Sequence, residues 1–534
     1  MDYAGEFNLS TQKGEWSFKD NWTGLDSYLF IMQYDHEFNN IVWNSSVEDL
    51  LAHAPLNLHI FFGSYDAAYK PKINEIEQRL GQVLDSMSPE LQEHWIDRLH
   101  FLDTGAGDID GALGEFIQDK GSFWFTIDRF QRWREIGSLF DWIAYQQNKP
   151  QSEQYPMYFM ANEAVRFNFE VTIQERMGEI DEHEIVLWDN EKHAGGWGGT
   201  HSSTREVIFP DAAQMEAYNA MSLYLYTACP DHLQGKDNGC NEWDYLMQLF
   251  ICDYPSDETG PDGECQPEET MECQCEKPDG SVVPGTIPCS EGAWGQCSCP
   301  CNTEFARWVT SYGREGDWLT DITPMLSLVS GGGPKKFRFA SANGYDVDMR
   351  IFLYNDGTAA RPKTAKQLWG TGGGDSFNAQ YNDSKTPITF TPPEGTTKVV
   401  LSALITGHGF GTTYDNCAEF CNHQHEFNIN GGIHMKDHPM ASSSYGCMEQ
   451  VEDGTVANQY GTWIYGRGGW CPGLDVKPWT VDITNDLVSG ENTIEYRGLF
   501  NGTTYDPVFN NDGYHPEIKM TSWLVFYTDF PTEQ

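Results

Sequence analysis

The first 228 residues of the chain contain no cysteine, and all 14 cysteines lie from Cys229 onward. The N-terminal part therefore has no thiol chemistry and no disulfides. An even number of cysteines at short spacings is typical of disulfides made in an oxidising compartment. The first residues also lack the apolar core of a signal peptide. We therefore expect a secreted or periplasmic protein whose export signal has been removed.

Long apolar runs and basic residues are also scarce. No run of about 18 apolar residues occurs, so we expect no membrane span. The chain has 79 acidic and 33 basic residues, a formal net charge of −46. Such a surface repels nucleic acid phosphates and anionic lipids, so neither is an expected partner. A neutral or sugar ligand, a cationic partner or a salty environment each fits this charge, and the oligomeric state stays open.

A chain of 534 residues is too long to fold around a single hydrophobic core, so we expect several domains. Residues 1–155 alternate short apolar runs with a helical stretch over residues 72–98, which predicts an α/β domain with a parallel sheet. Residues 123–139 resemble the closing hairpin of thioredoxin-like domains, but no Cys-x-x-Cys is present, so redox chemistry is excluded. The prolines at 150 and 156 predict a linker after this domain.

Beyond the linker, short strands separated by Gly, Asn and Asp predict a mainly β protein of two tandem antiparallel β-sandwiches, jelly-roll-like in form. We expect the first strand at Val165 to Val171. A composition shift near Thr386 predicts sandwiches over residues 157–385 and 386–534. An insert at residues 252–301 holds eight cysteines whose pairing stays open.

Residues 405–430 contain a carboxylate that is a candidate for a catalytic role. Cys417-Ala-Glu-Phe-Cys421 can close into a very small disulfide ring, which would hold Glu419 on a stiff loop. The alternating apolar positions that follow predict a strand. The segment therefore places a carboxylate at the tip of a tight loop between two strands.

Two further motifs carry candidate groups. Cys240-Asn-Glu-Trp-Asp244 places Asp244 at the start of a strand, beside the indole of Trp243. A carboxylate next to a flat aromatic side chain is typical of sugar-handling sites, because apolar sugar faces stack on aromatic rings. The segment from Arg467 to Gly473 adds Trp470 and a guanidinium that can clamp a carboxylate.

Together, these three motifs resemble the peptide-N-glycosidase F family of glycoamidases. Members carry a Cys-Asp-Glu-Trp-Asp segment, a Cys-Ala-Glu-Trp-Cys ring and an Arg-x-Gly-Trp-Cys-Pro-Gly segment in this order, over two tandem jelly-roll-like sandwiches. The resemblance covers roughly residues 165–534. It implies three disulfides and leaves eight cysteines for the insert. The implied pairs are Cys229 with Cys240, Cys417 with Cys421, and Cys447 with Cys471.

The family cleaves the amide between asparagine and the first N-acetylglucosamine of N-linked glycans. The resemblance therefore implies N-glycosylated proteins or glycopeptides as partners and no cofactor. It assigns activation of the attacking water to Asp244 and positioning of the sugar or the water to Glu419. It implies a substrate-binding set of Glu242, Trp243, His408, Arg467 and Trp470.

Two departures from the family pattern keep a second interpretation open. A further family glutamate lies in a strand whose counterpart here, residues 337–343, contains no glutamate. A sugar-stacking tryptophan of the family is replaced by His408. These changes favour the alternative of a non-catalytic glycan-binding or cell-surface module on the same fold.

A histidine cluster supports a third interpretation. His408, His423, His425, His434 and His438 lie close in the sequence, and the pair His423 and His425 on a strand places two rings on one face, as metal ligands require. The family fold is also similar to that of copper monooxygenases. The alternative is a copper-dependent monooxygenase-like protein with the ligands His408, His423 and His425, whereas the main interpretation requires no metal.

Overall fold

The computed structural model describes residues 3–120, 123–137, 156–180, 182–195, 202–229, 242–252, 270–276, 282–288, 301–411, 416–508 and 513–531. The chain divides into two compact units. One comprises Met1–Thr172 and Val451–Gly461, and the other comprises Ile173–Gln450 and Thr462–Gln534. Among the described residues, no helix is long and apolar enough to cross a membrane.

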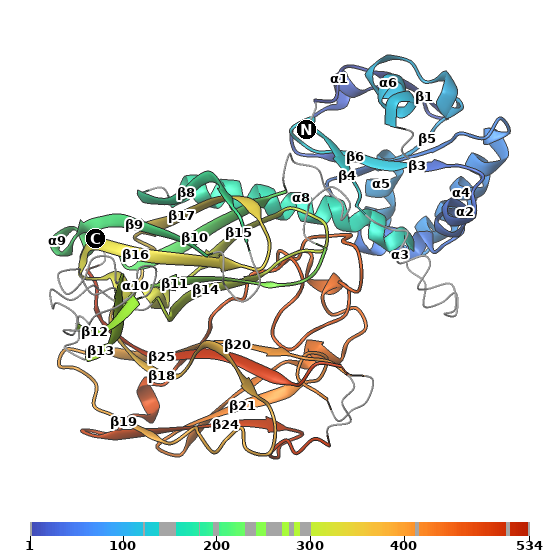
Figure 1. The fold of residues 1–534 in the computed structure, drawn as a ribbon. Helices are drawn as coiled ribbons and strands as arrows, with labels where there is room; N and C mark the ends of the chain where they lie inside the picture. The colour runs from blue at the N-terminus through green and yellow to red at the C-terminus, as the bar shows by residue number, and fades with distance from the viewer. Residues whose placement is uncertain are drawn as a thin grey trace. The chain divides into compact units, whose positions relative to one another are not determined.

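The first unit is built around a five-stranded mixed sheet (Figure 1). Its order is β5 (Leu99–Phe101), β4 (Leu58–Ser64), β3 (Ser27–Gln33), β6 (Trp124–Ile127) and β7 (Trp133–Glu135). Strands β3, β4 and β5 pair in parallel, whereas β6 and β7 form an antiparallel hairpin. The parallel strands and the closing hairpin predicted from the sequence are therefore present. The thioredoxin-like assignment stays a prediction.

Helices connect the parallel strands of this sheet. α2 (Glu37–Trp43) and α3 (Val47–His53) lie between β3 and β4 in the chain, and α4 (Tyr69–Leu84) and α5 (Pro89–Arg98) lie between β4 and β5. The helix predicted over residues 72–98 is thus two helices. The second begins where Ser88 caps the backbone N–H of Leu91 and Pro89 occupies the first turn. α6 (Gly111–Lys120) precedes β6, and a separate hairpin joins β1 (Asn8–Thr11) and β2 (Gly14–Ser17).

The prediction of a strand at Val165 to Val171 is wrong, because these residues lie within the helix α8 (Pro156–Glu179). Their alternating apolar pattern is embedded in a longer run without glycine or proline up to Gly178, in which buried residues continue on successive positions. Arg166 and Glu170 are paired four residues apart, as helical spacing allows. The predicted linker at residues 150–156 lies almost wholly outside the described residues.

The second unit contains two sandwiches, each made of two four-stranded antiparallel sheets (Figure 1). In the first sandwich, one sheet has the order β15 (Gly316–Asp321), β10 (Ala220–Ala228), β17 (Tyr345–Tyr354), β8 (His183–His193). The other has the order β14 (Thr303–Val309), β11 (Leu246–Ile251), β16 (Gly332–Ser341), β9 (Ser202–Asp211). Trp188 and Phe339 pack across the two sheets with ring centroids 5.9 Å apart.

The second sandwich has the sheet orders β18 (Ala360–Ser376), β25 (Glu517–Asp529), β20 (Lys398–His408), β23 (Trp479–Asp482) and β19 (Ile388–Phe390), β24 (Asn492–Phe500), β21 (His423–Ile429), β22 (Gly432–Asp437). Phe390 and Phe526 meet between these sheets. Because β18 pairs with β25, this sandwich begins before residue 386, where the sequence predicted its start. The composition shift near Thr386 marks the loop after β18 and not the start of the sandwich.

The two sandwiches meet through a buried polar cluster. The guanidinium of Arg307 on β14 is fully buried and contacts both carboxylate oxygens of Glu304, at 2.7 and 2.6 Å. It also donates to the Thr406 hydroxyl at 2.7 Å and to the Lys519 carbonyl at 2.9 Å, both in the second sandwich. Removing one partner would leave a buried charge uncompensated. This cluster therefore favours one relative position of the two sandwiches.

The Cys-rich insert leaves the first sandwich between β11 and β14. Cys252 and Cys301 form a disulfide that closes its base. Within it, β12 (Thr270–Glu276) and β13 (Val282–Pro288) pair as an antiparallel hairpin. The remaining cysteines of the insert lie outside the described residues or in strands whose side chains are not described.

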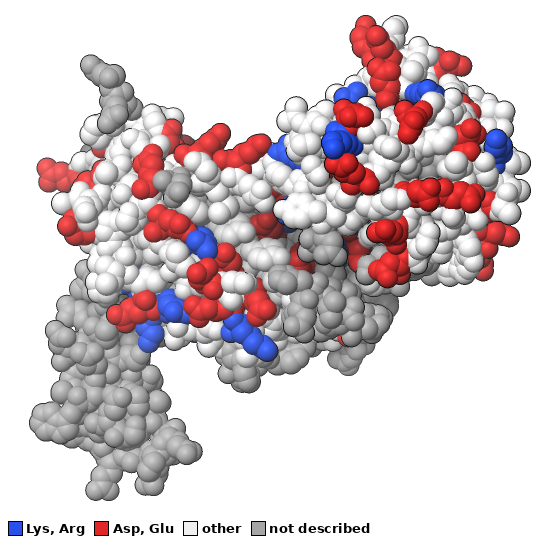
Figure 2. All heavy atoms as spheres, turned by 90° about the horizontal axis from the view of Figure 1, so that it is seen from above, with Lys and Arg blue, Asp and Glu red and all other residues white. Residues whose placement is uncertain are grey.

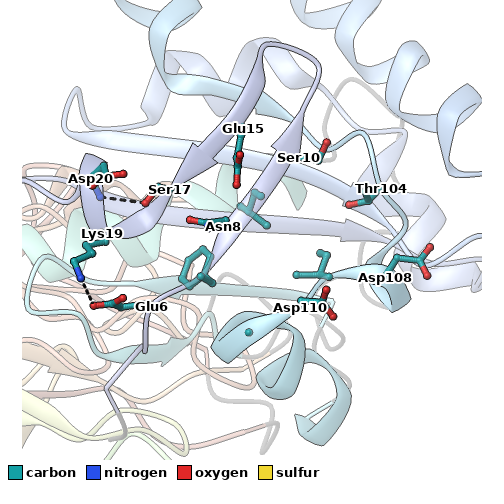
Figure 3. A pocket seen from close by; sticks show the side chains of 14 residues that line it. Glu6, Asn8, Ser10, Glu15, Ser17, Lys19, Asp20, Thr104, Asp108 and Asp110 are labelled. Atoms are coloured by element: carbon teal, nitrogen blue, oxygen red, sulfur yellow. Dashed lines mark hydrogen bonds and ion pairs between the residues drawn. The ribbon is translucent and has the colours of Figure 1, made fainter.

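Acidic side chains are spread over the face of the molecule seen in Figure 2, and isolated Lys and Arg side chains lie between them. This distribution agrees with the net charge of −46. A cavity of about 810 Å³ in the first unit is also mainly acidic (Figure 3). Its lining includes Glu15, Asp108 and Asp110, and the ion pair between Lys19 and Glu6 lies at its edge.

Candidate active site

Asp244 and Glu419 are brought together by one arginine. Asp244 directly precedes β11 of the first sandwich, and Glu419 lies in the loop between β20 and β21 of the second. Nη2 of Arg467 lies 3.2 Å from Oδ2 of Asp244, and its Nε lies 3.4 Å from Oε1 of Glu419. The arginine side chain is 1% exposed, while those of Asp244 and Glu419 are 17% and 12% exposed. The result is a carboxylate–guanidinium–carboxylate cluster at the junction of the sandwiches.

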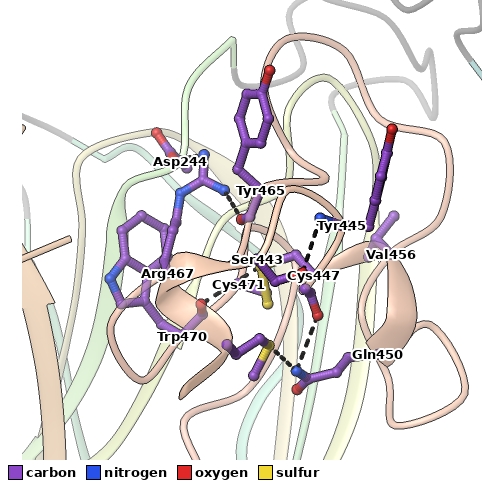
Figure 4. The surroundings of a disulfide bond; sticks show 12 residues. Asp244, Ser443, Tyr445, Cys447, Gln450, Val456, Tyr465, Arg467, Trp470 and Cys471 are labelled. Atoms are coloured by element: carbon purple, nitrogen blue, oxygen red, sulfur yellow. Dashed lines mark hydrogen bonds and ion pairs between the residues drawn. A yellow bond between two sulfur atoms is a disulfide. The ribbon is translucent and has the colours of Figure 1, made fainter. Parts of the chain in front are cut away.

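Backbone carbonyls and aromatic rings hold the guanidinium in place. Its Nη1 donates to the Tyr465 carbonyl at 2.8 Å, and Figure 4 shows the group directed at Asp244. The guanidinium carbon of Arg467 lies 4.9 Å from the ring centroid of Trp470 and 5.3 Å from that of Phe420. A planar guanidinium clamped in this way presents two edges to two carboxylates.

The disulfide ring predicted from Cys417 and Cys421 is present, and so is the disulfide between Cys447 and Cys471 (Figure 4). Gly409 donates its backbone N–H to Oε2 of Glu419 at 3.2 Å. The ring and this hydrogen bond hold the carboxylate in one orientation. Cys229 is also in a disulfide, but Cys240, its predicted partner, lies outside the described residues.

Burial controls the proton affinity of both carboxyls. It raises the pKa of Glu419 to about 7, against the opposing charge of Arg467 and with the support of the Asp244 charge. It also raises the pKa of Asp244, although Arg467 and a hydrogen bond from Tyr312 act in the other direction. Glu419, with a pKa of about 7, can therefore exchange protons with a bound substrate near neutral pH, and the pKa of Asp244 is raised in the same direction.

Tyr312 is a site residue that the sequence analysis did not find. Its hydroxyl contacts Asp244 and also accepts a hydrogen bond from Nη2 of Arg467 at 3.3 Å. Burial raises the pKa of this phenol, so it stays protonated and acts as a donor to the carboxylate. It lies in a loop after β14, where no motif or spacing distinguishes it from an ordinary buried tyrosine.

A cleft of about 790 Å³ opens beside Asp244. Its wall includes His408 and Gly409 from the second sandwich and Gln248 from the first. Ala340, Ser341 and Ala342 also line it, so the segment that corresponds to the strand of the further family glutamate reaches the cleft without a carboxylate. Glu517 at the start of β25 supplies a carboxylate to the wall, 3.9 Å from the ammonium group of Lys519.

The predicted substrate-binding residues divide into two groups. His408 stacks on Trp470 with ring centroids 5.2 Å apart and an interplanar angle of 24°, and the Trp470 indole donates to the Gly407 carbonyl at 2.7 Å. Trp470 in turn lies 4.9 Å from the guanidinium of Arg467, so His408 and Trp470 lie next to the group of Arg467 and the two carboxyls. By contrast, Glu242 is exposed and Trp243 is 54% exposed, and both precede the first cleft-lining residue, Asp244.

The histidine set predicted from the sequence is not the one that the fold assembles. His423 and His425 lie together in the core of the second sandwich, and their companion is His438. His408 instead lies at the cleft, where its Nε2 is 2.8 Å from the Thr406 hydroxyl. The set His408, His423 and His425 is therefore corrected to His423, His425 and His438.

The fold and the site define a tandem β-sandwich protein with paired carboxyls at the sandwich junction. A family model described as "Peptide-N-glycosidase F, C terminal" matches residues 376–525. The peptide-N(4)-(N-acetyl-beta-D-glucosaminyl)asparagine amidase F of Elizabethkingia miricola is 31% identical over 364 residues, which cover 65% of this chain and 84% of the relative. The chain therefore belongs to the peptide-N-glycosidase F family.

Two solved structures are also similar to this chain. PNGase F, a glycosylasparaginase from Flavobacterium meningosepticum, is 19% identical, with 66% of this chain and 97% of that chain covered and a TM-score of 0.43. PNGF-II is 14% identical, with 68% of each chain covered and a TM-score of 0.40. Residues 1–155 of the present chain and most of its Cys-rich insert are not part of the motif resemblance seen in the sequence.

Proposed function

We propose that this protein is a glycoamidase that hydrolyses the amide bond between asparagine and the first N-acetylglucosamine of an N-linked glycan. The observation that carries the proposal is the bridge from Arg467 to Asp244 and Glu419 at the edge of the cleft. Membership in the family of an enzyme named for this amidase reaction supports it.

In the proposed reaction, ionised Asp244 accepts a proton from water, and the water oxygen attacks the carbonyl carbon of the asparagine side chain. The carbon–nitrogen bond then breaks as Asp244 returns the proton to the departing nitrogen, so that the nitrogen leaves with the sugar as a glycosylamine and the asparagine becomes aspartate. Glu419, with a pKa of about 7, is present in both protonation states near neutral pH. It can therefore donate a hydrogen bond to the sugar or the water and help position either one.

The aromatic pair at the cleft is the proposed sugar platform. His408 lies on Trp470 and lines the cleft, so its ring can contact the apolar face of a sugar. The partners are accordingly N-glycosylated proteins or glycopeptides. The disulfides Cys252–Cys301, Cys417–Cys421 and Cys447–Cys471 support action in an oxidising compartment, outside the cytoplasm.

The test is hydrolysis of a defined N-glycopeptide in water enriched in oxygen-18, followed by mass spectrometry. The proposal requires conversion of the glycosylated asparagine to aspartate with one heavy oxygen. Asp244→Asn should reduce the rate roughly 10²–10⁴-fold, the usual contribution of a general base. Asp529→Asn, at an exposed strand end, is the matched control and should keep the wild-type rate.

Two results would contradict this proposal. Release of the glycan without heavy oxygen in the peptide would assign cleavage to another bond. Retention of intact glycopeptide by the folded protein, without any release, would favour a glycan-binding module. The absence of a carboxyl among Ala340, Ser341 and Ala342 is the feature that makes this second outcome worth measuring.

A further inference from the structure

Three histidines meet in the interior of the second sandwich, away from the cleft lining. His423 and His425 are alternate residues of β21, and the burial pattern of this strand directs both side chains inward. His438 follows β22, the neighbouring strand. The three residues are at most 4% exposed. One ring nitrogen of each lies within 4.8 Å of those of the other two.

The hydrogen bonds around the rings leave nitrogen atoms facing one another. Nδ1 of His425 lies 2.7 Å from the Tyr496 hydroxyl, which in turn lies 2.8 Å from the Tyr381 hydroxyl. Nε2 of His425 is thereby directed at Nδ1 of His423, 2.8 Å away. We assign the proton of His425 to Nδ1, because this leaves the lone pair of Nε2 inside the group. An outer oxygen partner of this kind is what orients metal-ligating histidines.

His423 and His438 each have an Nε2 without a hydrogen bond among the described residues. The Ala418 carbonyl lies close to Nε2 of His423, without the alignment of a full hydrogen bond. Nε2 of His438 is buried and accepts or donates no hydrogen bond among the described residues. A buried polar atom without a partner is costly, and a bound ion is one ordinary way to satisfy it.

We propose that His423, His425 and His438 form a binding site for a late first-row transition-metal ion, Cu⁺ or Zn²⁺. Neutral imidazole is the ligand form that these ions require. The three buried imidazoles can supply uncharged nitrogen ligands. The ligand set carries no charge, and the cost of burying an ion rises with the square of its charge, which favours Cu⁺ over Zn²⁺.

The group can close around an ion with small movements. Metal–nitrogen bonds of about 2.0–2.1 Å place two ligand nitrogens at most about 4.2 Å apart. The widest spacing allowed by the present limit of 4.8 Å would therefore shorten by at least roughly half an ångström, and the 2.8 Å between Nε2 of His425 and Nδ1 of His423 would widen.

The position of the group indicates what the ion would do. A Cβ on Gly468 would lie 2.6 Å from Nε2 of His423, and a Cβ on Gly469 would lie 2.6 Å from Cε1 of His438. Both rings therefore lie directly against the backbone between Arg467 and Trp470. Gly468 also donates to the Glu419 carbonyl at 2.6 Å and accepts from Gly407 at 2.7 Å. An ion here would hold the segments that carry Glu419, His408 and Arg467, as a structural support and not as a reactant.

The test measures metal content and stability, so it does not depend on the proposed amidase activity. The full-length, disulfide-intact protein is unfolded in denaturant and refolded with Zn²⁺, or anaerobically with Cu⁺ as its acetonitrile complex. We expect about one ion per chain and a raised Tm for one of the two ions. X-ray absorption of the loaded protein should show imidazole nitrogen and no sulfur in the first coordination sphere.

The variant His438→Gln should lose the ion and the rise in Tm. His434→Gln is the matched control, because His434 lies on β22, pairs with Asp486 at 2.8 Å and is outside the group. Substoichiometric uptake of both ions by the folded wild-type protein would overturn the proposal. Sulfur ligation would overturn it too, since the ion would then be held by cysteines. The spectrum of the wild-type protein decides the question even if His438→Gln does not fold.

Discussion

Nη2 of Arg467 lies 3.2 Å from Oδ2 of Asp244, and this contact joins a loop of the second sandwich to the start of a strand in the first. The same guanidinium reaches Glu419 at 3.4 Å. Because the arginine is fully buried, its charge acts on both carboxyls with little screening. The ionisation of the candidate active site therefore depends on one side chain that is itself hidden from solvent.

Arg467→Met should abolish the function of the site and reduce stability. Removing one partner of a buried ion pair typically costs about 3–5 kcal/mol, because the remaining charge is uncompensated. The pKa values of Asp244 and Glu419 should rise further, since the attraction that lowers them is gone. Denaturant titration at one pH measures the loss of stability, and its repetition over a range of pH measures the change in the two pKa values.

Arg497→Met is the control for this variant. Arg497 is 60% exposed and pairs with Glu426 on β21. An exposed pair of this kind contributes about 0–1 kcal/mol. Equal destabilisation by the two substitutions would show that the bridge to Asp244 has no special weight.

Tyr312→Phe removes the hydroxyl that contacts Asp244 and Arg467. The hydrogen bond to Asp244 lowers the pKa of this carboxyl, so its loss should raise the pKa. The acidic limb of the kcat/KM profile should then move to higher pH, with roughly a tenfold loss of activity at its lower end. Tyr226→Phe, which loses a hydroxyl bound to Glu315 at 2.9 Å, should leave the limb in place.

Glu419 should make the stability of the protein depend on pH. Its pKa is 4.5 ordinarily and about 7 in the fold, so the folded state binds the proton more tightly. The stabilisation is complete below about pH 4.5 and is lost as the pH rises through about 7. The free energy of unfolding should fall by roughly 1–3 kcal/mol over this window relative to Glu419→Gln. Parallel curves for the two proteins would contradict the raised pKa.

His408→Ala should weaken substrate binding without much effect on the chemical step. The ring stacks on Trp470 and lines the cleft, but it does not belong to the group formed by Asp244, Glu419 and Arg467. We expect KM for a glycopeptide to rise roughly 5–30-fold, a contribution of about 1–2 kcal/mol, with kcat within a factor of a few. A fall in kcat at unchanged KM would instead assign the ring to the reaction itself. His434→Ala serves as the control.

Much of the fold was predictable because its signals are local. Short apolar runs separated by turn residues predicted the strands of the sandwiches, and the short spacing of Cys417 and Cys421 predicted their disulfide. Alternation of apolar residues gave a wrong prediction at Val165 to Val171. These residues belong to a helix whose first half is buried on most sides, so apolar residues also occur at alternate positions. The boundary at residue 386 failed because strand pairing between β18 and β25, and not composition, determines where the second sandwich begins.

The sequence alone therefore determined the motifs, the family resemblance and the net negative charge, from which we expect neither nucleic acid nor anionic membrane surfaces as partners. Only the tertiary structure decided which groups meet. Tyr312 joins Asp244 through a loop that carries no motif, and His438 replaces His408 beside His423 because β22 ends next to β21. The physical reason is that proximity between residues distant in the chain is created by strand pairing and sheet packing, whose register no local pattern encodes. Burial, which raises the pKa of Glu419 to about 7, likewise exists only once those layers have closed.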